Sequence, residues 1–330
     1  MAVFLPSLKK SGHLDRIQMT ICNIGSRKID KNDDYASLGW GIFAPNLKIY
    51  GFDADEDTCN EANQDIAVRQ INWTEKHIPL ALNKQIGETT LHVTKSLWCS
   101  SLYIPNETYL ARFEGLSQMM NLDFSVDIET TTLDAFCKDE GIDEIDFLQI
   151  DVQGADLDVL QGGSKLLKRC KVIQTEVEFS HLYINQPLFA DIDIYLRKQG
   201  FTLFDLAVAK RTRAISPVYS ATRLGQMLWG DAYYFRDLIR EDLDSDLKSP
   251  HQILKLACIA DVMDFPDYAL EILEYLTLQH GDNPMYNFAD NIVDTLSKFP
   301  PLVENGLHFL PIIATIRDYI SSEVAILNNL

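Results

Sequence analysis

The sequence of 330 residues predicts an α/β protein with a mostly parallel sheet, followed by an all-helical C-terminal segment. Short apolar runs that end in glycine or acidic residues alternate with segments of helix-forming residues through the first two thirds of the chain. A succession of strand, turn, helix and strand is typical of a parallel sheet. Beyond Arg236 the strand patterns stop, and apolar residues recur at helical spacing.

Strands are expected where a short apolar run is bounded by turn residues. The clearest is 145–150, which ends at Asp151, and the first, 19–24, breaks into a turn at Gly25 and Ser26. In chain order the predicted strands are 19–24, 47–52, 78–82, 89–93, 145–150, 172–177, 201–206 and 232–235.

Helices are expected between these strands and throughout the C-terminal part. Thr132 is a plausible N-cap, and Gly200 is a suitable residue to end a helix. Ser249 and Pro250 form a start signal for the first helix of the C-terminal part. We predict two domains, 1–240 and 241–330. The predicted helices are 58–65, from 132 onward, 156–167, 192–199, from 250 onward, 267–280, 284–298 and 310–327.

Bulk composition limits the function classes. The formal net charge of −19 disfavours nucleic-acid and membrane-surface partners, and no Lys/Arg-rich run is visible. Six scattered cysteines without a CxxC pair suit a reducing compartment. The apolar start is too short for a signal peptide, and no apolar run reaches the ~20 residues that span a bilayer. We therefore expect a cytoplasmic protein without membrane insertion, and no residue spacing indicates a metal site.

The predicted strand ends supply a candidate ligand site, because open α/β sheets bind ligands at the carboxyl ends of their strands. Polar or small residues follow three strands: Asn23 with Gly25, Asp53 with Asp55, and Asp151. A glycine turn and an acid that can accept ribose hydroxyls suit an adenosine-containing ligand. A dinucleotide would require GxGxxG, whereas the sequence here reads NIGSRKID, and no GxxxxGK[ST] occurs. A cofactor without phosphates, such as S-adenosylmethionine, tolerates this looser turn.

Several blocks of sequence carry a family resemblance. The stretch 131–163, TTLDAFCKDEGIDEIDFLQIDVQGADLDVLQGG, strongly resembles the FkbM family of methyltransferases, whose members read TLDxF and then DFLKIDVEGAE. The blocks 174–206 and 226–236 are similar to the segments that follow in that family, and FDADEDTCNEAN, from Phe52, is similar to its FEP stretch. The resemblance covers roughly 20–236, and the helical tail occurs in only some relatives.

This resemblance implies a Rossmann-like methyltransferase sheet of the mostly parallel, seven-stranded type, with the helical tail as an appendage. It also implies an S-adenosylmethionine-dependent O-methyltransferase that acts on a hydroxyl of a sugar, glycan or small molecule. Asn23 and Gly25 would then lie under the methionine part of the cofactor. Asp53, with Asp55 beside it, would take the ribose hydroxyls, Asn83 would approach the adenine, and Asp151 would face the amino or sulfonium end.

An alcohol acceptor needs a base whose pKa lies near the working pH. The candidates are Asp151, Glu176, Glu178 and His181. Glu176 and Glu178 are two residues apart and share one face of a strand. His181 has the more suitable unperturbed pKa.

The first loop and the central motif depart from the family pattern. The usual DxGAxxG is missing, and Gln153 and Asp156 replace two glutamates. Two rivals therefore stay open: a non-catalytic binding module with the same fold, and a less favoured NAD-dependent dehydrogenase. The apolar stripes of the tail could recruit a partner, cap the sheet domain or form a homodimer.

Overall fold

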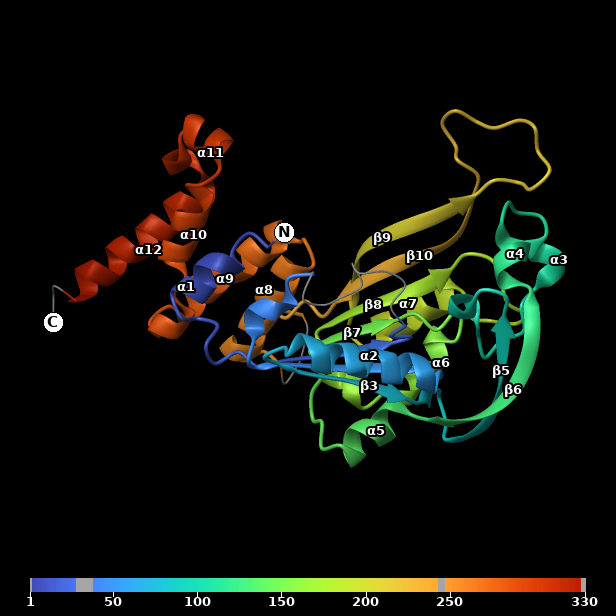
Figure 1. Ribbon diagram of the computed structural model, residues 1–330. Coiled ribbons are helices and arrows are strands. Elements are labelled where there is room, and N and C mark those ends of the chain that lie inside the picture. The colour runs from blue at the N-terminus through green and yellow to red at the C-terminus, as the bar shows by residue number, and fades with distance from the viewer. Residues whose placement is uncertain (1, 28–37, 243–246, 328–330) are drawn as a thin grey trace. The chain divides into compact units, whose positions relative to one another are not determined.

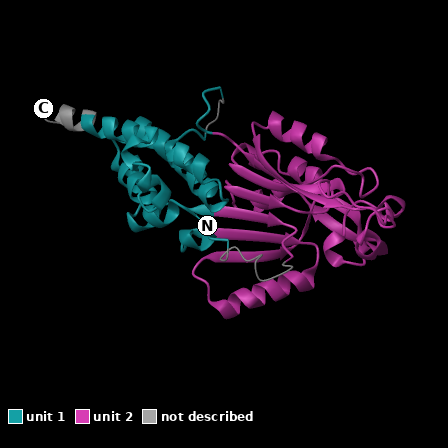
Figure 2. Ribbon diagram, turned by 90° about the horizontal axis from the view of Figure 1, so that it is seen from above, with its two compact units in different colours: residues 1–19, 30–47, 238–330 teal, residues 20–29, 48–237 magenta. Residues whose placement is uncertain are grey.

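The computed structural model describes residues 2–27, 38–242 and 247–327 (Figure 1). The chain forms two compact units (Figure 2). The sheet unit contains residues 20–29 and 48–237, and the helical unit contains residues 1–19, 30–47 and 238–330. The domains inferred from the sequence, 1–240 and 241–330, remain a prediction, because compact packing does not show which segments fold independently.

A seven-stranded sheet forms the centre of the sheet unit. Strands β2 and β3, β1 and β7, and β7 and β8 pair in parallel. β10 is antiparallel to both of its neighbours. This is the mostly parallel, seven-stranded sheet that the resemblance implied. In spatial order its strands are β3 (Thr74–Pro79), β2 (Leu47–Asp53), β1 (Met19–Ile24), β7 (Phe147–Ile150), β8 (Val172–Glu178), β10 (Gln226–Phe235) and β9 (Thr202–Arg211).

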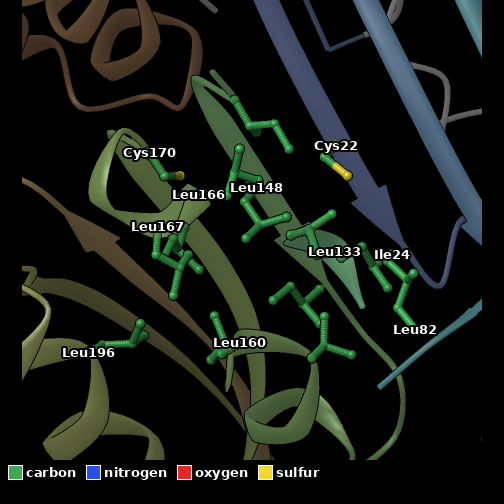
Figure 3. Close-up of a cluster of buried hydrophobic side chains, with 14 of the residues drawn as sticks. Cys22, Ile24, Leu82, Leu133, Leu148, Leu160, Leu166, Leu167, Cys170 and Leu196 are labelled. Atoms are coloured by element: carbon green, nitrogen blue, oxygen red, sulfur yellow. The ribbon is translucent and has the colours of Figure 1, made fainter. Parts of the chain in front are cut away.

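The central strands read as apolar runs because they are buried. Cys22 of β1 and Leu148 of β7 are at most 1% exposed and pack in one cluster with Leu160 and Leu196 (Figure 3). Leu160 lies in α6 (Asp156–Gly162) and Leu196 in α7 (Phe189–Lys198), and both helices contact β8. All six cysteines are buried free thiols. Cys22 therefore acts as a small hydrophobe in the core.

A second sheet of three strands lies outside the main sheet. Its order is β4 (Ala81–Leu82), β6 (Leu122–Thr131) and β5 (Gly87–Thr94). The prediction of one strand at 78–82 was wrong, because the chain turns at Leu80 between β3 and β4. β3 also begins earlier, at Thr74, since an edge strand tolerates the polar alternation TEKHIP. The predicted strand 89–93 exists, but it belongs to this small sheet.

The other helices of the sheet unit lie between strands. α2 (Glu56–Arg69) contacts β3, and the Asp55 side chain caps it by accepting from the amides of Asp57 and Thr58. α5 (Leu133–Asp139) begins where the sequence predicted. Two short helices, α3 (Glu107–Leu110) and α4 (Leu116–Met120), precede β6.

The N-cap of α5 at Thr132 can be tested by mutation. The Oγ1 of Thr132 accepts the Ala135 amide at 3.1 Å, which confirms the predicted N-cap of α5. We expect Thr132→Ala to lower the free energy of unfolding by about 1 kcal/mol, because an N-cap acceptor is lost. Urea unfolding measures this loss. Thr132→Ser keeps the acceptor and should restore most of it; equal losses in both variants would contradict the cap.

The helical unit is built around α8 (Pro250–Val262) and α9 (Pro266–His280), which contact each other. The Ser249 side chain accepts the Gln252 amide, as its cap signal predicted. Asp261 of α8 is 2% exposed and accepts the amides of Val3, Phe4 and Leu5 at 2.8–2.9 Å. These bonds tie the N-terminal segment to α8. The other helices of this unit are α1 (Leu5–Lys10), α10 (Ala289–Leu296), α11 (Pro300–Glu304) and α12 (Pro311–Leu327).

Candidate functional site

A cavity of about 520 Å³ opens at the carboxyl ends of the main-sheet strands. Its polar part is formed by Gly25 after β1, Asp53 at the end of β2, Asp151 after β7, and Glu176 of β8. These residues come from neighbouring strands, so the parallel sheet brings them together. The structure thus places most of the predicted strand-end residues in one cavity.

Gly25 permits the closest backbone approach in the cavity. Its φ is +83°, and a Cβ at this position would lie 1.9 Å from the carbonyl oxygen of Asp151. The Gly25 amide donates to the Phe52 carbonyl at 2.9 Å, and the Asp151 amide donates to the Ile24 carbonyl at 2.9 Å. The loops after β1 and β7 are therefore held against each other at a point where a side chain cannot fit.

Asp53 and Asp55 form an acidic corner with Arg27. Asp53 Oδ1 accepts the Asp55 amide at 2.9 Å, and Arg27 Nη2 lies 3.8 Å from Asp53 Oδ1 and 2.5 Å from Asp55 Oδ2. Burial raises the pKa of Asp53, although the Asp55 amide and the charge of Arg27 oppose this shift. Burial acts in the same direction on Asp55, but hydrogen bonds from Arg27 and Thr58 outweigh it, and the pKa of Asp55 is lowered.

Gln153 links two carboxyl groups in the cavity. Its Nε2 donates to Asp151 Oδ1 and to Glu176 Oε2, each at 2.7 Å. Its Oε1 accepts from the Tyr183 hydroxyl at 3.0 Å, and its carbonyl accepts from Ser101 Oγ at 2.6 Å. Gln153 has a φ of +55°, a conformation that costs a non-glycine residue of order 1–3 kcal/mol and persists only where its surroundings fix it. These hydrogen bonds hold Gln153 in that conformation.

Burial and neighbouring negative charge raise the pKa values of the acidic groups in and beside the cavity. Asp151 faces the cavity and is accessible there, but protein surrounds it, so burial raises its pKa; hydrogen bonds from Gln153 and Glu176 oppose the shift. Burial, followed by the negative charge of Asp151, raises the pKa of Glu176 well above its usual value and that of Asp156 to about 8. The same two causes raise the pKa of Asp231 to about 6. Raised pKa values of this kind bring carboxyl groups toward the range in which they can accept or release a proton near neutral pH.

Glu178 borders the same cavity but is enclosed. It is 1% exposed, and neither carboxyl oxygen has a hydrogen-bond partner among the described groups. Burial first, then the charges of Asp156 and Asp151, raise its pKa well above the usual value, while the nearby Gln186 amide opposes the shift. Asp151 and Glu176, whose side chains are more accessible, are better placed to contact a ligand.

The remaining walls are apolar and come largely from the small sheet and the segments before it. Their residues are not among the candidate site residues named from the sequence, and no strand was predicted at the position of β6. The alternation of Phe124, Val126 and Ile128 along 122–131 was the available signal. The apolar wall residues include Leu91, Val93, Leu97, Trp98, Leu116, Met119, Met120, Phe124, Val126 and Ile128.

Three predicted site residues do not line this cavity. Asn23 lies within β1, paired with Gln149. The Oδ1 of Asn83 accepts the Lys84 amide at 2.7 Å. His181 is exposed, and its carbonyl accepts from Asn106 Nδ2 at 3.0 Å. The cavity instead includes Arg27 and Gln153, of which the first carried no sequence signal and the second was noted as a departure from the family pattern.

Acidic side chains dominate the polar lining of the cavity. Its described residues include five carboxyl groups and a single basic side chain, Arg27, which already contacts two of them. The five are Asp53, Asp55, Asp151, Glu176 and Glu178. Such a lining suits a cationic or neutral ligand and opposes a phosphorylated one. In the described ranges, no group of three His, Cys, Asp or Glu side chains is arranged to hold a metal ion.

No helix within the described part of the chain is long and apolar enough to cross a bilayer.

A curated relative matches part of the chain. A relative from Sinorhizobium fredii (strain NBRC 101917 / NGR234), 2-O-methyltransferase NoeI, is 38% identical over 78 residues, which cover 23% of this chain and 32% of the relative. The chain thus spans about a third of that relative's length.

Solved structures resemble the chain only distantly. The structure of methyltransferase FkbM from Methylobacillus flagellatus KT has a TM-score of 0.37 at 10% identity, over 67% of this chain and 45% of that one. M. capricolum TrmK, solved with S-adenosyl-homocysteine, has a TM-score of 0.34 at 12% identity, over 94% and 96% of the two chains. These values carry no conclusion about function. Residues 44–203, however, match the family model described as the methyltransferase FkbM domain, so the chain contains an FkbM methyltransferase domain, as its motifs implied.

Proposed function

We propose that the protein is an S-adenosylmethionine-dependent O-methyltransferase that acts on a hydroxyl of a sugar, glycan or small molecule. The observation that carries the proposal is the acidic lining of the cavity: five carboxyl groups and one paired arginine at the strand ends of a methyltransferase-type sheet. S-adenosylmethionine carries an ammonium and a sulfonium, so this lining attracts it.

The residues present fit such a cofactor. Gly25 leaves the backbone open where a Cβ would collide with the Asp151 carbonyl. Asp53 has lone pairs free besides the bond from the Asp55 amide and can accept ribose hydroxyls. Asp151, accessible in the cavity, would face the positively charged end. Asn23 and Asn83 lie outside the cavity lining, and we assign them no direct contact.

Proton transfer would be carried by the Asp151 and Glu176 pair. When bound, the cofactor supplies an electrophilic methyl group. An acceptor hydroxyl that approaches it must lose its proton, and either carboxylate oxygen could take that proton when ionised. The Gln153 amide, 2.7 Å from both carboxyl groups, fixes their positions and cannot itself accept a proton through Nε2. The enclosed Glu178 would act through its electrostatic effect on Glu176.

The cavity walls suggest the acceptor class. The carboxyl groups disfavour a phosphorylated acceptor, while the apolar wall from Leu97 to Ile128 favours an acceptor with an apolar face. Transfer to a hydroxyl oxygen is supported further by the relative NoeI, which is a 2-O-methyltransferase.

The dinucleotide alternative is poorly supported by the same cavity. A pyrophosphate would meet five carboxyl groups and an arginine already paired with Asp53 and Asp55.

The test is calorimetric titration with S-adenosylmethionine and, separately, with S-adenosylhomocysteine, which lacks the sulfonium charge. We expect Asp53→Ala to weaken both ligands by about 10- to 100-fold, because hydrogen bonds to a charged group are lost. Asp151→Asn should weaken S-adenosylmethionine more than S-adenosylhomocysteine. The exposed Asp127 of β6 gives a control variant, Asp127→Asn, which should bind both normally.

Absence of binding to the folded wild-type protein would refute the proposed cofactor. Binding that neither variant weakens would place the cofactor elsewhere. Normal binding without methyl transfer to any hydroxyl acceptor would favour the non-catalytic binding module.

A further inference from the structure

The connection between β9 and β10 has a charge opposite to that of the whole protein. Between Asp205 and Asp231 the chain has four basic residues and no acidic one, whereas the formal net charge of the protein is −19. The four are Lys210, Arg211, Arg213 and Arg223. Lys210, Arg213 and Arg223 are exposed. We call residues 210–227 the hairpin tip.

The hairpin tip also exposes large apolar side chains that nothing in the described structure covers. Ile215 is 96% exposed, Val218 77%, Leu224 68% and Tyr219 60%. Met227 follows at 45%. Scattered single apolar residues on a surface are ordinary, but four this exposed within ten residues form a patch.

The base of the hairpin tip is fastened to the segment between α3 and α4. The Glu114 amide donates to the Thr212 carbonyl at 3.1 Å, and the Ala214 amide donates to the Arg112 carbonyl at 3.0 Å. The guanidinium of Arg213 lies 4.5 Å from the Phe113 ring centroid. The acidic side chain of Glu114 also contacts the tip, because its Oε2 accepts a hydrogen bond from Thr212 Oγ1 at 2.8 Å. The tip itself extends beyond the strands, next to α3 and α4 (Figure 1).

We propose that the hairpin tip docks on the surface of an anionic membrane, with its apolar side chains among the lipid headgroups and its basic side chains on the phosphates. Apolar burial and attraction of Lys and Arg to anionic lipids are the two contributions to interfacial binding. The acidic remainder of the protein does not prevent this, because salt screens charges beyond a Debye length of about 8–10 Å.

A nucleic acid fits the same surface less well. Single-stranded nucleic acids bind through aromatic stacking beside basic side chains. The tip offers a single exposed aromatic ring, Tyr219, against four exposed aliphatic or thioether side chains, Ile215, Val218, Leu224 and Met227. Aliphatic side chains gain free energy by leaving water for lipid, and they gain no stacking with bases.

Sedimentation of the full-length protein with vesicles tests this proposal. Vesicles of phosphatidylcholine alone are compared with vesicles that contain about 30 mol% phosphatidylglycerol, a content that gives the anionic surface potential needed. We expect partition at least about tenfold higher on the anionic vesicles, and a strong decrease at about 0.5 M salt. Two variants separate the contributions: Ile215→Ser with Leu224→Ser removes apolar contacts, and Lys210→Gln with Arg223→Gln removes charges.

Each double variant should lose most of the anionic-vesicle binding. Val68 of α2 is 80% exposed outside the tip, so Val68→Ser is the matched control and should bind like the wild type. All variants should bind S-adenosylmethionine as the wild type does, which separates this test from that of the proposed function. Failure of the folded protein to bind anionic vesicles, or equal binding by the tip variants, would overturn the proposal. So would tighter binding to an unstructured RNA than to the vesicles.

Discussion

Replacing Gly25 with alanine is expected to weaken the binding of S-adenosylmethionine strongly. A methyl group at Gly25 would lie 1.9 Å from the Asp151 carbonyl oxygen, so the loops after β1 and β7 must separate. That separation displaces Asp151 and, through Gln153, also Glu176. We expect affinity to fall by at least about 100-fold, or about 2.7 kcal/mol. The free energy of unfolding should also fall by at least ~2 kcal/mol, from the left-handed backbone and the steric conflict together.

Gly141 provides a control that separates these two causes. Its φ is +67°, and a Cβ there would meet no atom within 4 Å. Gly141→Ala should therefore show the cost of a left-handed alanine without the steric conflict, and it should bind the cofactor normally. Calorimetric titration and urea unfolding of both variants give the comparison. Normal binding by Gly25→Ala would show that the cofactor does not depend on the contact between the two loops.

Removing the buried acid Asp156 is expected to change how stability depends on pH. Burial and the charge of Asp151 raise the pKa of Asp156 to about 8 in the folded protein, against about 4 in an unfolded chain. Between these values the folded state holds a proton that the unfolded state has lost. The free energy of unfolding therefore falls as pH rises from about 4 to about 8, by up to about 1.4 kcal/mol per pH unit for this proton.

Asp156→Asn removes this contribution while keeping an oxygen that can accept the Gly154 amide, now 3.1 Å from Asp156 Oδ2. The variant should gain more stability relative to the wild type at pH 8 than at pH 5. Urea unfolding at several pH values measures the two slopes. The exposed Asp123 supplies the control, and Asp123→Asn should leave the slope unchanged. Identical slopes in the wild type and Asp156→Asn would show that Asp156 ionises normally in the folded protein.

The sequence predicted best the interior strands of the main sheet. β1, β2, β7 and β8 each contain several buried apolar residues, and their predicted bounds differ from the observed ones by two residues at most. β3 and β6 were misplaced or missed, because an edge strand and a strand over a cavity mix polar and apolar residues. The sequence did not show to which sheet a strand belongs. β5 has a clear strand pattern, but tertiary packing determines its partner strand.

The candidate site also has residues that the sequence predicts and residues that it does not. Gly25, Asp53 and Asp151 follow directly from strand ends, because parallel strands bring those positions together. Arg27 and Gln153 could not be assigned in this way. Arg27 depends on the path of a loop, and the link from Gln153 to both Asp151 and Glu176 depends on a left-handed backbone that the residue type does not indicate. His181 has the right chemistry for a base but lies on an exposed segment outside the cavity lining.

The three amides that Asp261 accepts from Val3, Phe4 and Leu5 also bear on how the protein can be divided. A fragment that starts at residue 241 would contain α8 without these donors and would leave a carboxylate in an apolar interior with its hydrogen bonds unmade. We therefore expect the helical tail to be less stable when it is excised or grafted without residues 3–5. Its exchange between proteins would have to carry both ends of the chain together.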